Sequence, residues 1–152
     1  MTTNLDKLTP LALDLSKAFP RSPRETLAGY VVAARALDKC RAVLAGTDDG
    51  YIFNCPLDQL FFGFTGIDAE AFKAFVATGA TDAEVAAWIT EHAQPRERIA
   101  IIHWNNSLRD KRVSELPDAL QTYLEDYIPT ISKPGKNVYV WFDVYDIEEG
   151  RL

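Results

Sequence analysis

The sequence predicts an α+β domain that is mostly helical, with five to seven helices and a small sheet of two or three strands. Apolar residues recur at helical spacing along most of the chain, and capping residues or prolines precede most of these segments. Only Tyr51–Asn54 and Asn137–Asp146 have the pattern of strands. The 152 residues fit a single domain, 1–152, in which 1–18 form a loosely patterned lead segment.

The longest helix is expected between Ser22 and Gly46. Ser22 can be its N-cap, Pro23 its first residue, and Glu25 the partner of Ser22 in a capping box. An apolar stripe then repeats at helical spacing until Gly46, a residue that commonly ends helices. This segment carries the strongest helical pattern in the chain.

The next part of the chain predicts a turn, a strand and three short helices. Thr47–Gly50 has turn composition and leads into the strand Tyr51–Asn54, after which Pro56 opens a helix. Two similar helical segments follow, starting near Ile67 and Thr81. We expect them to form a hairpin that packs three side chains of one helix against three of the other. These are Phe72, Phe75 and Val76, and Val85, Trp88 and Ile89.

The last third predicts two helices and the main strand. The helices are expected after Pro95 and after Ser114, and Lys133–Asn137 reads as a turn. Asn137–Asp146 then alternates Val and Phe with Tyr, Trp and Asp, which favours a strand. It is expected to pair with Tyr51–Asn54.

Composition excludes several classes of function. The formal net charge is −6, which disfavours nucleic-acid binding, and no apolar run is long enough to span a membrane. The amino terminus lacks a secretory pattern, and two cysteines in such a chain predict reduced thiols and a cytoplasmic location. Cys40, Cys55, His92 and His103 have no metal-ligand spacing, so we expect no metal and no cofactor.

Six stretches together resemble a bacterial family. They are FPRSPRETLAGY, ALDKCRA, YIFNCPLDQ, WNN, LEDYIP and YVWFDVYDIEEGRL, and they extend from about Phe19 to the C-terminus. The family is catalogued as domain of unknown function number 5069. The resemblance implies a small bacterial domain and supplies no activity, substrate or catalytic residue.

The amino-terminal part of the chain suggests an anion site. Residues 1–45 carry seven Lys and Arg against four Asp and Glu, whereas the remainder carries nine against eighteen. Arg21 and Arg24 flank Ser22, where free N–H groups of a helix start would favour an anion. Alternatively, the two arginines pair internally with acids near the end of the chain, at Asp143, Asp146 or Glu148.

Cys55 is the strongest candidate for a reactive group. A residue before proline takes the extended conformation of an N-cap, and the helix dipole would then favour a thiolate. Asp58 in the same first turn opposes that charge. A thiol nucleophile also needs a base, for which His103, with Asn106 one turn later, is the candidate. The simpler interpretation is a buried cysteine that starts a helix.

The leading hypothesis is therefore a non-catalytic module that binds a small anionic molecule or a protein partner. The alternative is a thiol-dependent hydrolase or transferase that uses Cys55 with His103. A third possibility is a homo-oligomer assembled through aromatic side chains. The polar or aromatic residues predicted to bind a ligand are Arg21, Arg24, Asp38, Arg41, Asn54, Asp58, Asn105, Asn106, Trp141 and Asp143.

Overall fold

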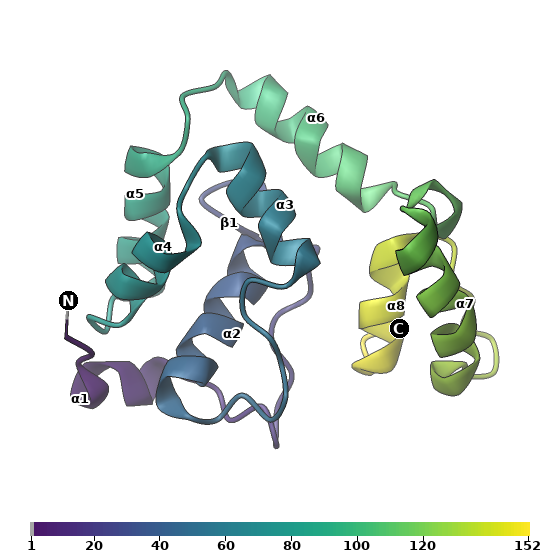
Figure 1. Ribbon diagram of the computed structural model, residues 1–152, viewed down its shortest axis with the longest axis horizontal. Coiled ribbons are helices and arrows are strands. Elements are labelled where there is room, and N and C mark those ends of the chain that lie inside the picture. The colour runs from purple at the N-terminus through teal and green to yellow at the C-terminus, as the bar shows by residue number, and fades with distance from the viewer. Residues whose placement is uncertain (1) are drawn as a thin grey trace. The chain divides into compact units, whose positions relative to one another are not determined.

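The computed structural model describes residues 2–152, which divide into two compact units at the boundary between Glu97 and Arg98. Along the described residues there are eight α-helices and one two-stranded antiparallel sheet (Figure 1). The mostly helical α+β class is confirmed, and the helix count is slightly above the expected range. None of these helices is both long and apolar enough to cross a membrane.

The first unit consists of five helices and the sheet. In chain order they are α1 (Leu5–Leu8), β1 (Thr26–Leu27), β2 (Tyr30–Val31), α2 (Ala33–Ala45), α3 (Pro56–Thr65), α4 (Ala69–Val76) and α5 (Asp82–His92), with a short 3₁₀ helix at Thr9–Leu11. Helix α2 contacts α1, α3 and α4, and its residues from Ala33 to Ala42 are all buried. It is the central helix of this unit.

Helix α2 begins at Ala33, so its predicted start at Ser22 is wrong. Residues 26–31 instead form a β-hairpin in which Leu27 pairs with Tyr30. Its two loop residues, Ala28 (φ 55°) and Gly29 (φ 88°), both have positive φ, as a tight type I′ hairpin turn requires. The predicted end at Gly46 is confirmed, since Gly46 adopts φ 75° and its N–H donates to carbonyls of the last turn.

The other helix signals of this unit are confirmed. Cys55 is the extended N-cap of α3 (φ −70°, ψ 170°) and Pro56 its first residue. Thr81 and Glu84 form a complete capping box at the start of α5. The predicted hairpin is α4 and α5, where the Trp88 ring lies 6.0 Å from Phe72 and 5.4 Å from Phe75, between centroids.

Both predicted strands are wrong. Tyr51–Asn54 forms turns, and Asn54 has φ 61°, a left-handed conformation that ends any extended run. The segment Asn137–Asp146 leads into helix α8 (Trp141–Glu148). There the Asp143 carboxylate accepts the N–H groups of Tyr139 and Val140, which provides the helix start that the alternating pattern concealed.

The second unit contains α6 (Arg98–Arg109), a 3₁₀ helix at Val113–Glu115, α7 (Asp118–Ile131) and α8. The two helices predicted after Pro95 and Ser114 are present, but α6 begins three residues past Pro95, and Pro117 rather than Ser114 precedes α7. The turn near Lys133 is confirmed, since the N–H of Lys136 donates to the Lys133 carbonyl at 3.0 Å. Helix α8 contacts both α6 and α7. The buried apolar residues of this unit are Leu108, Leu116, Leu124, Trp141, Phe142, Val144 and Ile147.

Gly79, between α4 and α5, has no Cβ, and this allows the backbone of α1 to lie close to it. We expect Gly79→Ala to lower the free energy of unfolding by about 1–3 kcal/mol. Gly79 has φ 83°, and an added Cβ would lie 2.3 Å from Cβ of Lys7 and 3.1 Å from its carbonyl carbon. Chemical denaturation measures the loss. Gly63→Ala is the matched control, because Gly63 lies inside α3 with open space around it. That variant should gain about 0.5–1 kcal/mol, and a Gly79→Ala protein as stable as the wild type would contradict the argument.

Candidate functional site

Helix α2 carries four charged residues that are almost fully buried: Arg35, Asp38, Lys39 and Arg41 are each 3% or 4% exposed. A buried charge is costly unless a partner of opposite charge or a hydrogen bond compensates it. We therefore identify which groups compensate each of these charges and which segments of the first unit they connect.

Two arginines and two aspartates form one ionic network. Arg21 makes a forked contact with Asp38 (Nη2 to Oδ1 2.9 Å, Nε to Oδ2 3.0 Å), and its Nη1 donates to Asp82 at 2.9 Å. Arg41 donates to the other oxygen of Asp82 at 2.7 Å and to the carbonyl of Ala80 at 3.0 Å. The network joins the stretch before the β-hairpin, where Arg21 lies, to α2 and the start of α5.

The same contacts act on the Asp82 carboxyl. Burial favours its neutral form, but the hydrogen bonds and charges of Arg41 and Arg21 outweigh burial, so the pKa of Asp82 is lowered from its ordinary value. Within the described chain, Nε of Arg41 is buried without a hydrogen-bond partner. By contrast, both Nη atoms of Arg21 and both Nη atoms of Arg41 donate hydrogen bonds, to Asp38, Asp82 or the carbonyl of Ala80.

The predicted anion site at Arg21 and Arg24 rested on a helix beginning at Ser22. Residues 22–25 instead form a turn, in which the Arg24 N–H donates to the Ser22 hydroxyl at 3.2 Å. The guanidinium of Arg21 already contacts two carboxylates. Anion binding by Arg21 and Arg24 stays a prediction, and it loses the helix terminus that motivated it.

A second cluster joins Lys39, Cys55 and Asp58. The Lys39 ammonium lies 3.0 Å from Oδ2 of Asp58 and 3.1 Å from Sγ of Cys55. Oδ2 of Asp58 also accepts the backbone N–H of Asn54 at 2.9 Å. Oδ1 of Asp58 is buried and has no hydrogen-bond partner among residues 2–152. Cys55 is half-buried, so this cluster reaches the surface.

The two cysteines have different surroundings. Cys40 is fully buried in α2, and this burial raises the pKa of its thiol to about 12. Cys40 is thus a core residue. Cys55, by contrast, lies beside the Lys39 ammonium and is only partly buried.

The predicted site residues of the second unit occupy varied positions. His103 and Asn106 are exposed on α6, and the Asn106 side chain accepts a hydrogen bond from Arg109 at 3.3 Å. Asn105 and Trp141 are buried. Cys55 lies in the first unit and His103 in the second, so their catalytic pairing stays a prediction.

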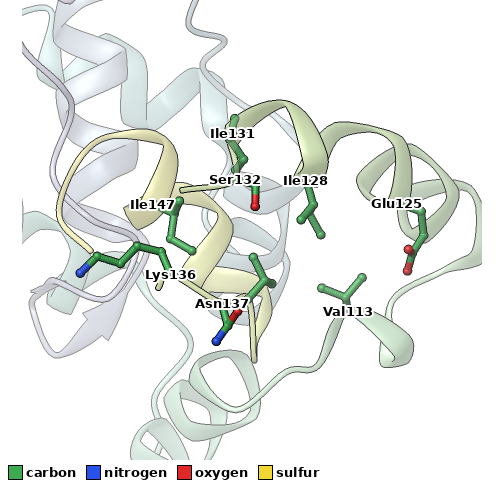
Figure 2. Close-up of a pocket in the computed structure, with 9 residues that line it drawn as sticks. Val113, Glu125, Ile128, Ile131, Ser132, Lys136, Asn137 and Ile147 are labelled. Atoms are coloured by element: carbon green, nitrogen blue, oxygen red, sulfur yellow. The ribbon is translucent and has the colours of Figure 1, made fainter. Parts of the chain in front are cut away.

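A hollow of about 360 Å³ lies within the second unit (Figure 2). Its walls come from the 3₁₀ helix, α7, the loop after α7, and α8. Figure 2 shows Val113, Ile128 and Ile147 directed toward the same space, with the Ser132 hydroxyl at one edge. The apolar lining residues are Val113, Ile128, Ile131, Val138 and Ile147, and the polar ones are Glu125, Ser132, Lys136 and Asn137.

The family scan matches residues 17–151 to the domain of unknown function DUF5069. The chain belongs to this family. No curated protein matches the chain. The family resemblance seen in the sequence is thereby confirmed, and the family description carries no activity.

Both clusters of this DUF5069 domain and its hollow lie inside the matched region. The sequence does not reveal the hollow, because its wall includes α8, whose residues alternate as in a strand. Nor does it reveal Lys39, because a lysine on a helix is usually solvated. Across residues 2–152, no three His, Cys, Asp or Glu side chains form a group that could hold a metal ion.

Proposed function

We propose that this DUF5069 domain is a non-catalytic module that binds a small anionic molecule with an apolar body in the hollow beside α7 and α8. The observation that supports it is the lining of the hollow, which combines five aliphatic side chains with four polar ones. Ligand sites usually combine an apolar cavity of about 300–1,000 Å³ with a small number of polar groups that fix orientation.

The polar groups indicate how such a ligand would lie. Lys136 and Asn137 belong to the loop after α7, whereas Glu125 belongs to the helix itself. An anionic group is attracted to Lys136 and repelled by Glu125, so we place it at the loop side of the hollow. The Lys136 side chain extends outward in Figure 2, and its flexible four-carbon stem allows the ammonium to follow a ligand.

The apolar part of the lining indicates the chemistry of the ligand away from its anionic group. Ile128, Ile147 and Val113 offer branched aliphatic surface and no hydrogen-bonding side chains. Burial of ligand carbon against such surface contributes about 0.8 kcal/mol per CH₂ group. A carboxylate with a short hydrocarbon chain therefore matches both the lining and the charge, and octanoate is a suitable probe.

Titration of the ¹⁵N-labelled protein with octanoate tests the proposal. We expect the amide signals of α7, α8 and the loop between them to shift, and the neutral analogue 1-octanol to bind more weakly. Lys136→Gln should weaken octanoate binding about five-fold, the effect of losing one partly exposed ion pair. Lys111→Gln removes the same charge elsewhere in this unit, outside the lining of the hollow, and should leave binding unchanged.

A second variant separates binding in the hollow from general attraction to the surface. Ile128→Trp fills the hollow with a larger apolar side chain and should abolish the octanoate shifts while the circular dichroism spectrum remains that of a folded protein. Octanoate shifts that persist in Ile128→Trp, or that are absent from the wild type at millimolar concentration, would rule out this site.

A further inference from the structure

The contact between Lys39 and Cys55 is unusual for a lysine. Its side chain is 4% exposed, and its ammonium has a carboxylate on one side and a thiol sulfur on the other. The Nζ to Sγ distance of 3.1 Å falls within the range of about 3–3.5 Å at which reacting atoms are held in near-attack arrangements. Cys55 is half-buried rather than enclosed, and we take its sulfur to be within reach of a small oxidant.

From this geometry we propose that Cys55 is a peroxide-sensitive thiol whose oxidised form is captured by Lys39 as a reversible sulfenamide. In the first step the Cys55 sulfur attacks hydrogen peroxide. An S–O bond forms, the O–O bond breaks, and the products are a sulfenic acid and one water. Hydrogen peroxide is the oxidant, and the sulfur is oxidised by two electrons.

In the second step the Lys39 amine attacks the sulfenic sulfur. An N–S bond forms and the S–O bond breaks, and the hydroxyl group leaves with a proton from the nitrogen as a second water. A sulfenic acid condenses with a backbone nitrogen in the same way. Lys39 must first lose its ammonium proton, and Oδ2 of Asp58, 3.0 Å from Nζ, lies in position to take it.

The burial of the cluster favours the product. The Lys39–Asp58 ion pair would become a neutral sulfenamide beside a neutral carboxylic acid, so no unpaired charge remains inside the protein. The proton arrives at Oδ2 of Asp58, and the neutral acid can then carry it on Oδ1, which has no hydrogen-bond partner in the described structure, while Oδ2 keeps the N–H of Asn54. The cluster thus supplies both the nucleophile and a place for its proton.

The link would join the loop at Cys55 covalently to α2, across 16 residues of sequence. A dithiol reverses it: one thiolate attacks the sulfenamide sulfur and releases the Lys39 amine, which leaves a mixed disulfide, and the second thiolate then releases Cys55 as the free thiol. The site therefore has the properties of a redox-sensitive cross-link between the central helix and the start of α3.

Mass spectrometry of the full chain after treatment with hydrogen peroxide tests the proposal. The expected product is lighter by about 2 Da, corresponding to the loss of two hydrogens, and dithiothreitol restores the original mass. Trypsin should no longer cut after Lys39, and the peptides that contain Lys39 and Cys55 should be recovered as one linked species. A product heavier by about 14 Da would show an oxygen between nitrogen and sulfur and would overturn the direct bond.

Three variants separate the link from other oxidation products. Cys40→Ala must still lose about 2 Da, since a Cys40–Cys55 disulfide would give the same mass change and cannot form in it. Cys55→Ser must show no loss. Lys39→Arg keeps the charge beside Asp58 but has no amine, so its sulfenic acid should accumulate and be trapped by dimedone. A folded Cys40→Ala protein that gains oxygen instead of losing hydrogen would overturn the proposal, as would an unchanged Lys39 cleavage in oxidised wild type.

Discussion

Replacing Asp58 with alanine is expected to lower the free energy of unfolding by about 3–5 kcal/mol. The side chain of Asp58 is 0% exposed and that of Lys39 is 4% exposed, with 3.0 Å between the charged atoms. Asp58→Ala leaves the Lys39 ammonium buried without a carboxylate, and the N–H of Asn54 loses its acceptor. Urea denaturation followed by circular dichroism measures the loss.

Two controls assign this effect to the unpaired buried charge. The double variant Lys39→Met/Asp58→Leu replaces the ion pair by apolar groups of similar size and should recover most of the lost stability, because buried pairs often exchange for hydrophobic ones at little cost. Lys17→Ala breaks an ion pair in which Lys17 is 82% and Asp14 is 42% exposed, and should change stability by less than about 0.5 kcal/mol. A double variant no more stable than Asp58→Ala would show that the charge is not the cause.

Some local sequence signals predicted helix boundaries, because caps and prolines act within one turn, although the capping box at Ser22 did not start a helix. Pro56, Thr81 and Gly46 each mark a helix boundary as expected. Where two local patterns compete, the sequence misleads. Asn137–Asp146 alternates like a strand, yet Trp141, Val144 and Ile147 also recur at helical spacing. The carboxylate of Asp143 at the helix start favours the helix.

The candidate site depends on partners that are distant in sequence, and these could not be predicted from local patterns. Asp38 and Arg41 stand three residues apart and suggest a pair within one helix. In the structure Asp38 binds Arg21 and Arg41 binds Asp82, with sequence separations of 17 and 41 residues. Lys39 reaches Cys55 in the same way. Cys55 and Asp58 stand out in the sequence as candidate site residues, whereas only the fold shows that the Lys39 ammonium contacts both of them.

The α4–α5 hairpin gives the second large prediction: Phe72→Ala should destabilise the protein by about 3–5 kcal/mol. Phe72 is 0% exposed, and its ring lies 5.4 Å from the ring of Phe62 and 6.0 Å from those of Phe53 and Trp88. Alanine removes the ring from all three contacts and leaves a cavity between rigid helices that can collapse only in part. Guanidinium denaturation followed by tryptophan fluorescence measures the effect.

Phe19→Ala is the matched control, since Phe19 lies in the same unit and is 52% exposed. It should cost less than about 1 kcal/mol, because a side chain that remains in water contributes little burial energy. Phe72→Leu should fall between these values, as it keeps most of the apolar volume. Equal losses for Phe72→Ala and Phe19→Ala would mean that the ring cluster around Phe72 does not hold the hairpin against α3. A loss confined to Phe72→Ala would identify the aromatic contacts predicted from helical spacing as a main source of stability in the first unit.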